Sequence, residues 1–427
     1  MKNIIYFTLL ICALSFSQQT PGKKQTAPIT IVGATAHIGN GTIIKKSLII
    51  IEDGKLTLVA DATTSKIASK GNVINADGKH VYPGFIAPNT TLGLVEIDAV
   101  RASNDQREMG TYNPHIRSII AYNTESKITE TMRPNGVLLG QITPRGGRIS
   151  GSSSIVQFDA WNWEDALIKE DDAIHINWPR TFNRSGWWAA PGPTVPNKKY
   201  TQQVTELNNF FKQAKFNNFK TAHLVYDSMK AVFDKTKKVF LHVNDEKQII
   251  DAVNFGLEQK IDFVLVGAYE SYKTIDLLKK NNIPVILQRV HKTPENDDDD
   301  YDLPYKLATI LTDAGVLVGL NTSGDMERMN SRNLPFYAGT CVAHGLNKEK
   351  AVQLITLNNA KILGISETTG SLELGKDATL FISEGDALDM RTNKLSHAFI
   401  QGRLISLETH QTELYKRYTN KYKSNSK

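Results

Sequence analysis

The chain has 427 residues, which is too long for one ordinary domain and long enough for a barrel of about 250 residues beside a smaller module. Its 50 Lys and Arg residues exceed its 44 Asp and Glu residues only slightly, and the surplus is spread along the chain, so the composition gives no support to nucleic-acid binding. Of its two cysteines only Cys341 follows the N-terminal apolar segment, which excludes an intramolecular disulfide in a processed chain.

Residues 1–17 predict a cleavable secretory signal. Lys2 precedes an apolar run from Ile4 to Phe16, and small residues lie near its end. About a dozen apolar residues fall short of the roughly 20 that cross a bilayer, so no membrane span is expected. We therefore expect an exported protein, secreted or periplasmic, whose polar residues 18–28 form a flexible leader.

The two ends of the remaining chain have the same pattern. Residues 29–80 contain short β-branched runs separated by Gly-Asn-Gly and Asp-Gly turns, and residues 370–410 repeat this pattern of strands and turns. We expect both segments to pair into one composite β-sandwich around a central domain.

Between these ends, residues 81–369 alternate strands with helical stretches, which is typical of a parallel sheet with crossover helices. The clearest unit is Val239–Val243 followed by the helical DEKQIIDAVNFGLEQ. Repeated units of this length predict an α/β fold with a (β/α)8 barrel.

Residues 145–200 hold all five tryptophans and are rich in Gly, Pro and Ser. One interpretation is an insertion with its own aromatic core, because Trp buries a large area. Another is a lid over the barrel mouth, in which Trp161 and Trp163 would line a ligand pocket.

Several segments, taken in order, resemble the amidohydrolase superfamily, specifically its imidazolonepropionase-like branch. They are IIIEDGKLTLVA, VINADGKHVYPGFI, LHVNDEKQI, KEKAVQLITLNNAKILGI and GSLELGKDATLFI. The resemblance runs from about Ile29 to Ile405. It implies a distorted TIM-like barrel, a sandwich built from both termini, and hydrolysis of C–N bonds by a metal-activated water.

The resemblance also implies metal ligands that this chain largely lacks. The family places His-x-His directly after the Pro-Gly-Phe-Ile strand, where this chain reads Ala87-Pro88-Asn89-Thr90. His242 matches the family histidine of the fifth strand. Gly267 stands where the sixth strand should supply a histidine, and Ser323 stands where the eighth should supply an aspartate. Asp325 follows two residues later.

These residues leave three functions open. The leading hypothesis is an exported amidohydrolase-fold protein with a largely lost metal centre, which binds a small-molecule ligand or a partner or hydrolyses poorly. The alternative is an active hydrolase with one metal, zinc if any, held by His242, Asp325 and His175. A third is a serine hydrolase built on Ser152–Ser154, for which the sequence offers no partner histidine or aspartate.

Three polar residues are predicted to meet a ligand at the barrel mouth. Asn89 follows the first strand, and His175 and Asn177 alternate on the expected fourth strand, so they share one face. The sequence leaves open whether the chain forms a homo-oligomer or an assembly with an active relative.

Overall fold

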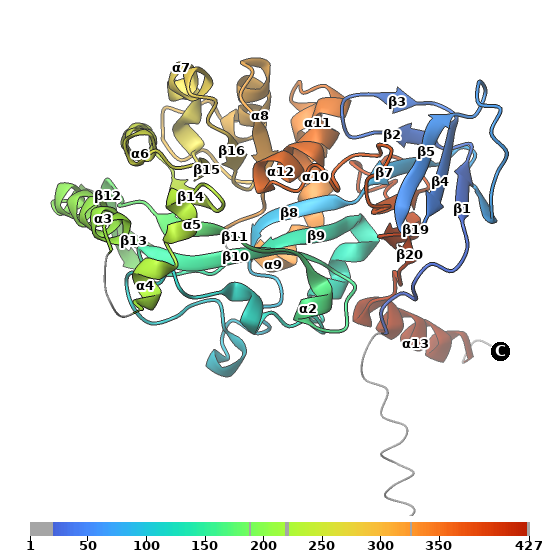
Figure 1. Cartoon of the computed structure of the whole chain (residues 1–427), viewed down its shortest axis with the longest axis horizontal. Coiled ribbons are helices and arrows are strands. Elements are labelled where there is room, and N and C mark those ends of the chain that lie inside the picture. The colour runs from blue at the N-terminus through green and yellow to red at the C-terminus, as the bar shows by residue number, and fades with distance from the viewer. Residues whose placement is uncertain (1–19, 188, 218–221, 325–326, 425–427) are drawn as a thin grey trace, which may run out of the picture.

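The computed structural model describes residues 20–187, 189–217, 222–324 and 327–424. Figure 1 shows a large curved sheet flanked by helices, with a smaller pair of sheets packed at one end. The expected mixed α/β architecture with a distorted barrel is thereby confirmed.

The smaller part is a β-sandwich of two sheets. The first sheet has the order β5–β4–β1–β6, with bounds Lys55–Asp61, Ser47–Glu52, Ile29–Val32 and Asn72–Asn75. The second has the order β20–β19–β18–β7–β2–β3, with bounds Arg403–Leu404, Leu395–Ile400, Leu380–Ser383, His80–Pro83, Thr35–His37 and Ile43–Ile44. Apolar side chains such as Ile31, Ile49, Leu380 and Phe399 form the buried core of this sandwich. Strands from both ends of the chain therefore share one sheet.

The larger part is an eight-stranded sheet curved into a barrel. Its order is β17–β16–β15–β14–β11–β10–β9–β8, with bounds Val318–Leu320, Val285–Leu287, Phe263–Gly267, Lys238–Val243, Leu167–Asn177, Ile149–Gln157, Val137–Ile142 and Phe85–Thr90. Seven strands run in the same direction, whereas β10 is antiparallel to both β9 and β11. Hairpin turns therefore replace two of the crossover helices.

Helices cover the outside of the parallel half of the barrel. Those between β11 and β17 are α3 (Tyr200–Lys215), α4 (Leu224–Asp227), α5 (Lys230–Phe233), α6 (Glu246–Gln259), α7 (Ile275–Lys280) and α8 (Leu303–Asp313). Asp245 starts α6 with a capping box, because its side chain accepts from the Gln248 amide while the Gln248 side chain bonds back. After β17 come α9 (Glu327–Asn330), α10 (Leu334–Ala343), α11 (Lys348–Ile355) and α12 (Leu357–Leu363).

The remaining elements are short or peripheral. The helix α2 (Trp163–Ala166) joins β10 to β11, and α13 (His410–Ser424) ends the described chain. Five 3-10 helices complete the described elements: η1 (Arg101–Ser103), η2 (Ser118–Ala121), η3 (Thr129–Asn135), η4 (Tyr269–Thr274) and η5 (Ser331–Asn333). Among the described residues no helix is long and apolar enough to cross a membrane.

The helix α12 closes the barrel opposite its mouth. Lys238, at the start of β14, donates from Nζ to the Ile362 carbonyl at 2.6 Å, and Lys169 of β11 donates to the Leu363 carbonyl at 3.3 Å. Apolar side chains of α12 pack with lumen residues such as Ile86 and Phe240. An apolar layer therefore fills the lower part of the lumen.

Asn359 of α12 also bridges the two edge strands of the barrel. In the described residues no backbone ladder joins β17 to β8. The Asn359 Nδ2 instead donates to the Ile86 carbonyl of β8 at 2.9 Å and to the Leu320 carbonyl of β17 at 3.1 Å. Gly319 makes room for this amide, because a Cβ there would lie 2.1 Å from the Asn359 Oδ1.

The expected insertion at 145–200 contains two strands of the barrel, β10 and β11, so it is not a separate unit. Only the hairpin of β12 (Phe182–Trp187) and β13 (Ala190–Pro196) projects from the barrel as a separate two-stranded sheet. The sequence concealed this, because short strands and loops alternate quickly in the segment.

The tryptophans of this segment do not form one core. Trp178 packs on Phe255 of α6, whereas Trp161 is 62% exposed. Trp188 lies outside the described residues. The expected signal at 1–17 lies outside them too. The expected leader contacts the fold where it is described, since the Gly22 amide donates to Asp159 at 2.8 Å and Gln25 bonds to the Ile51 carbonyl.

Candidate functional site

Two histidines meet inside the mouth of the barrel, at the carboxyl ends of its parallel strands. His175 on β11 pairs in register with Phe240 of β14, whereas Asn177 pairs with His242, so His242 lies one step nearer the mouth. The His175 Nδ1 and the His242 Nε2 are 2.9 Å apart. The structure therefore places His175, which was predicted to face the lumen, beside His242.

A hydrogen-bonded row extends inward from this pair. The His175 Nε2 lies 2.9 Å from the Ser153 Oγ, and the Ser153 hydroxyl donates to Asp172 Oδ1 at 2.7 Å. We call Asp172, Ser153, His175 and His242 the lumen chain. Its first three members are almost fully buried, and His242 is partly buried.

A β-bulge aims Asp172 at the lumen. The pairing of β10 with β11 shifts between Ser153 and Ile155, and Asp171 in the shifted part has a φ of 45°. A bulge turns a side chain away from the ordinary alternation of a strand. The Asp172 carboxylate consequently accepts from Ser153 and from Gln141 Nε2, the latter at 2.8 Å.

Burial favours the neutral form of both histidines of the lumen chain. It lowers the pKa of His175 well below its usual range, and the neighbouring charges of His242 and Arg145 lower it further. Burial, with the charge of Arg145, lowers the pKa of His242 to about 3. Burial also raises the pKa of Asp172, while the hydrogen bonds from Ser153 and Gln141 act in the opposite direction.

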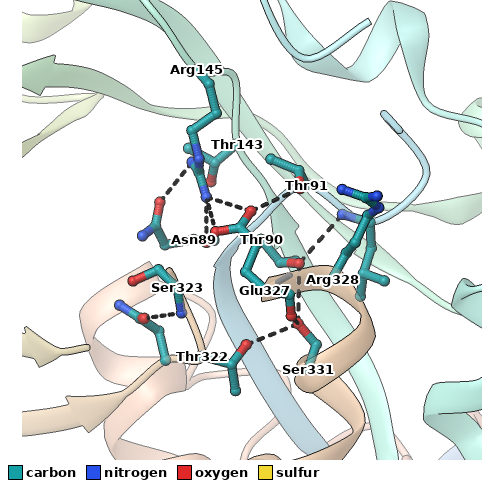
Figure 2. Close-up of polar contacts among 12 residues, drawn as sticks. Asn89, Thr90, Thr91, Thr143, Arg145, Thr322, Ser323, Glu327, Arg328 and Ser331 are labelled. Atoms are coloured by element: carbon teal, nitrogen blue, oxygen red, sulfur yellow. Dashed lines mark hydrogen bonds and ion pairs between the residues drawn. The ribbon is translucent and has the colours of Figure 1, made fainter. Parts of the chain in front are cut away.

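A second group of polar residues lies beside the lumen chain. Figure 2 shows Arg145 pointing towards Asn89 and Glu327. Arg145 donates to Asn89 Oδ1 at 2.9 Å and to the Asn89 carbonyl at 2.8 Å, and it contacts both Glu327 oxygens at 2.9 and 3.0 Å. Thr91 donates to Glu327 Oε1 at 2.7 Å. We call Asn89, Thr91, Arg145 and Glu327 the mouth cluster.

The mouth cluster is held from below and is connected to the lumen chain. The Ser331 Oγ lies 2.9 Å from Thr322 Oγ1 and 3.3 Å from Thr90 Oγ1, which ties the start of η5 to the ends of β17 and β8 (Figure 2). The Asn89 amide donates to Gln141 Oε1 at 3.0 Å. Because Gln141 also donates to Asp172, one side chain links the two groups.

The other predicted site residues have different positions. Asn177 donates to the carbonyls of Gly146 and Gly147 and to Ser150, so its amide holds the turn between β9 and β10. Trp161 and Trp163 follow β10, which runs antiparallel, so they lie at the end of the barrel opposite the mouth. The structure does not bring them to the histidines. Asp325 lies outside the described residues.

The residues present do not fit a family-type metal centre. Both ring nitrogens of His175 are engaged within the lumen chain, which leaves Nδ1 of His242 as the one imidazole nitrogen there without a protein partner among the described residues. No group of three or more His, Cys, Asp or Glu side chains in the described ranges is placed to hold a metal ion. The positive charge of Arg145 acts on both imidazoles and also disfavours a dication.

Sequence reasoning missed Gln141, Ser153 as a partner of histidine, Asp172, and the pair of Arg145 and Glu327. Gln141 was detectable, because it is the polar residue in the otherwise apolar strand VLLGQI. The sequence offered no histidine or aspartate partner for a serine hydrolase built on Ser152–Ser154. The structure places His175 and Asp172 beside Ser153. Ser153 is nevertheless fully buried and donates its proton to Asp172, so its Oγ is not placed to attack a substrate.

Several known proteins are similar to this chain. A model of the amidohydrolase family matches residues 303–405. An imidazolonepropionase of Flavobacterium johnsoniae is 26% identical over 88% of this chain and 93% of that protein. One of Flavobacterium psychrophilum is 30% identical over 39% of this chain and spans 46% of that protein.

The solved structures agree on the fold. An amidohydrolase of Thermotoga maritima has a TM-score of 0.75 at 21% identity and covers 88% of this chain and 99% of that chain. At this level of identity the likeness concerns the arrangement of the elements and leaves the chemistry of the mouth to the residues described above.

Proposed function

This chain belongs to the amidohydrolase family, and from that premise we propose that it is an exported member whose metal centre has largely been lost. It binds a small ligand or a partner at the barrel mouth, or it hydrolyses C–N bonds poorly. The observation that carries this proposal is the engagement of both His175 nitrogens, which leaves one imidazole nitrogen where a hydrolytic metal needs several ligands.

The chemistry of water activation supports this proposal. A catalytic zinc lowers the pKa of its bound water only when about three protein ligands fix its coordination. Arg145 lies close enough for its charge to act on both histidines. Asn89, in the segment where the family has His-x-His, accepts a hydrogen bond from Arg145. The guanidinium beside the histidines is itself paired with Glu327, and it cannot lower the pKa of a bound water as a metal would.

Simple reversal of the losses is blocked at one position. Gly267, where the family has a histidine, has a φ of 92°, and a Cβ there would lie 2.6 Å from the Val243 carbonyl oxygen. Any side chain at Gly267 therefore strains the end of β15. Rebuilding this centre needs a changed backbone as well as changed side chains.

Metal analysis tests the proposal directly. We expect protein purified without chelator to carry less than one zinc per chain, and we expect titration calorimetry to show no tight zinc binding. Amide hydrolysis, measured against buffer, should be slow and unchanged by chelator. His242→Ala is the matched variant for both measurements.

One result would overturn the proposal in favour of the alternative. If one tight zinc per chain is found, and if both the zinc and a chelator-sensitive hydrolysis disappear in His242→Ala and in Asp325→Ala, the chain is an active hydrolase with one metal. Asp325 would then reach His242.

Export and assembly are part of the same proposal and need separate tests. The apolar segment Ile4–Phe16 supports export, and N-terminal sequencing of protein from the native envelope fraction should find cleavage near Gln18. A chain that retains Met1 in that fraction would contradict export by cleavage. A homo-oligomer or an assembly with an active relative would appear as a larger species when the native fraction is sized.

A further inference from the structure

The last described helix, α13, stands apart from the helices that cover the barrel. Figure 1 shows it below the sandwich, and the residues matched by the amidohydrolase family end at 405, before α13 begins at His410. Its first turn is anchored, because the His410 amide donates to the Glu130 carboxylate at 2.6 Å. Beyond this anchor, Tyr415–Lys423 is exposed at every residue except Thr419. The helix is therefore held at one end and open to solvent along the rest.

Three tyrosines form a row on this exposed part of α13. Tyr415, Tyr418 and Tyr422 follow one another at intervals of three and four residues, which places them on one face of the helix. Their exposed fractions are 73%, 48% and 66%, so this face does not pack on the body of the protein. We call these three residues the tyrosine stripe. Contiguous exposed rings, unlike scattered ones, indicate an interaction surface.

Basic side chains border the tyrosine stripe on both sides. With about 3.6 residues per turn, Lys416 and Lys423 project on one side of it. Arg417 and Lys421 project on the other side, and Arg417 lies over the ring of Tyr418 at 5.4 Å from its centroid. The helix carries four basic residues against one acidic residue. The surface around the stripe is therefore positively charged and suited to an anionic partner.

The residues of α13 favour a lipid surface over a protein groove. Leu414 is the single aliphatic residue of the helix, which therefore lacks the repeated apolar anchors of a helix that docks into a groove or pairs in a coiled coil. Tyrosine instead suits the boundary between lipid and water, because its ring is apolar and its hydroxyl stays wet. Long basic side chains can lay their stems along apolar surface and keep their charges at the lipid phosphates.

We propose that α13 docks the protein on an anionic lipid surface, with the tyrosine stripe in the headgroup layer and the flanking Lys and Arg side chains on the lipid phosphates. The helix lies on the surface and does not span the bilayer. Each basic residue near such a surface changes the affinity about fivefold, so the contact is reversible and sensitive to salt. It involves none of the residues at the barrel mouth, so it stands whether or not a metal is bound there.

Sedimentation of the whole chain with vesicles tests this proposal. The protein should bind vesicles of equal parts phosphatidylglycerol and phosphatidylcholine, bind phosphatidylcholine alone far more weakly, and be released by high salt. Lys416→Gln with Lys421→Gln should weaken binding about 25-fold. Tyr418→Ala with Tyr422→Ala keeps every charge and should weaken it about tenfold, because apolar area in the headgroup layer is lost.

Matched controls remove the same groups elsewhere. Tyr301 is 80% exposed between β16 and α8, and Lys230 and Lys247 are exposed on α5 and α6. Tyr301→Ala, and Lys230→Gln with Lys247→Gln, should bind vesicles as the wild type does. Losses as large as those of the α13 variants would show a general effect of charge or aromatic content. That result, or equal binding to neutral vesicles, overturns the proposal.

Hydrogen exchange locates the contact. Anionic vesicles should slow exchange in peptides that cover residues 410–424 and leave α3 unchanged, whereas protection elsewhere with none in α13 overturns the proposal. Two further results would identify a different occupant and overturn it as well. One is equally tight binding to duplex DNA at the same salt. The other is a dimer that forms without lipid and is lost in the tyrosine variant.

Discussion

Ser153 shows how much one buried hydroxyl can organise. Its Oγ lies 2.9 Å from the His175 Nε2 and donates to Asp172, so its removal leaves a buried imidazole nitrogen and a buried carboxylate each short of a partner. Groups left unpaired in a barrel interior cost more than the hydrogen bond itself contributes, because nothing replaces their lost water.

We therefore expect Ser153→Ala to lower the free energy of unfolding by about 1–3 kcal/mol. The matched control is Ser383→Ala in β18, since Ser383 is equally buried and its Oγ has no partner among the described residues. That substitution should be neutral or slightly stabilising. Chemical unfolding of both variants checks this, and equal losses would show that the lumen chain adds nothing.

The same residues show what the sequence can predict of a site. His175 was predictable, because alternation in AIHIN places it on the lumen face of its strand. Asp172 was not, because the bulge at Asp171 breaks that alternation and a bulge has no fixed sequence signature here. Arg145 and Glu327 were not, because residues far apart in the chain meet only after the barrel has curved.

At the scale of elements, the edge between β17 and β8 depends on α12. The Asn359 amide donates to one backbone carbonyl on each of these two strands, between which the described residues form no ladder. The barrel can stay open along its backbone because one side chain satisfies both strands, and Gly319 gives that side chain its space.

Asn359→Asp keeps the shape of the side chain and replaces the donor by an acceptor. Two carbonyl oxygens would then face a carboxylate in a buried place, so we expect a loss of about 3–5 kcal/mol, typical of an unpaired buried charge. Asn358→Asp is the neighbouring control, because Asn358 is only partly buried and makes one bond, to the Val318 carbonyl. Thermal unfolding compares them, and equal melting temperatures would mean that α12 holds the edge without Asn359.

Element boundaries followed from the sequence where turns are strong and failed where direction changes. The Asp-Gly turns indicated the strands that they join, and the helical pattern that begins at Asp245 indicated α6. The pattern of residues 145–200 could not reveal that β10 runs backwards, because an antiparallel buried strand and a parallel one share the same apolar composition.

At the scale of the whole molecule, one carboxylate joins three parts of the chain. Asp159, just after β10, pairs with Arg133 at 3.1 Å and with Arg403 of β20 at 3.0 Å, and it accepts from the Gly22 amide at 2.8 Å. It therefore connects the barrel, the sandwich and the N-terminal segment at one buried point.

We expect Asp159→Ala to destabilise the protein by about 3–5 kcal/mol, because it removes the carboxylate that pairs with the buried Arg133 and the partly buried Arg403. Asp389→Ala is the control, since its partner Arg391 is 83% exposed and such a surface pair contributes about 0–1 kcal/mol. Calorimetry should show a lower melting temperature for the first variant only. A wild-type melting curve for Asp159→Ala would mean that the three parts are held together elsewhere.

The reversed direction of β10 bears on how the molecule reaches its fold. β9, β10 and β11 follow one another as two hairpins within residues 137–177, whereas each strand from β14 to β17 follows a connection that contains one or more α-helices. Contacts between near segments close small loops, which costs little chain entropy and forms them early. We expect pulsed hydrogen exchange during refolding to protect these three strands before β16 and β17, so that the meander acts as the nucleus on which the parallel half assembles; protection of β16 first would contradict this order.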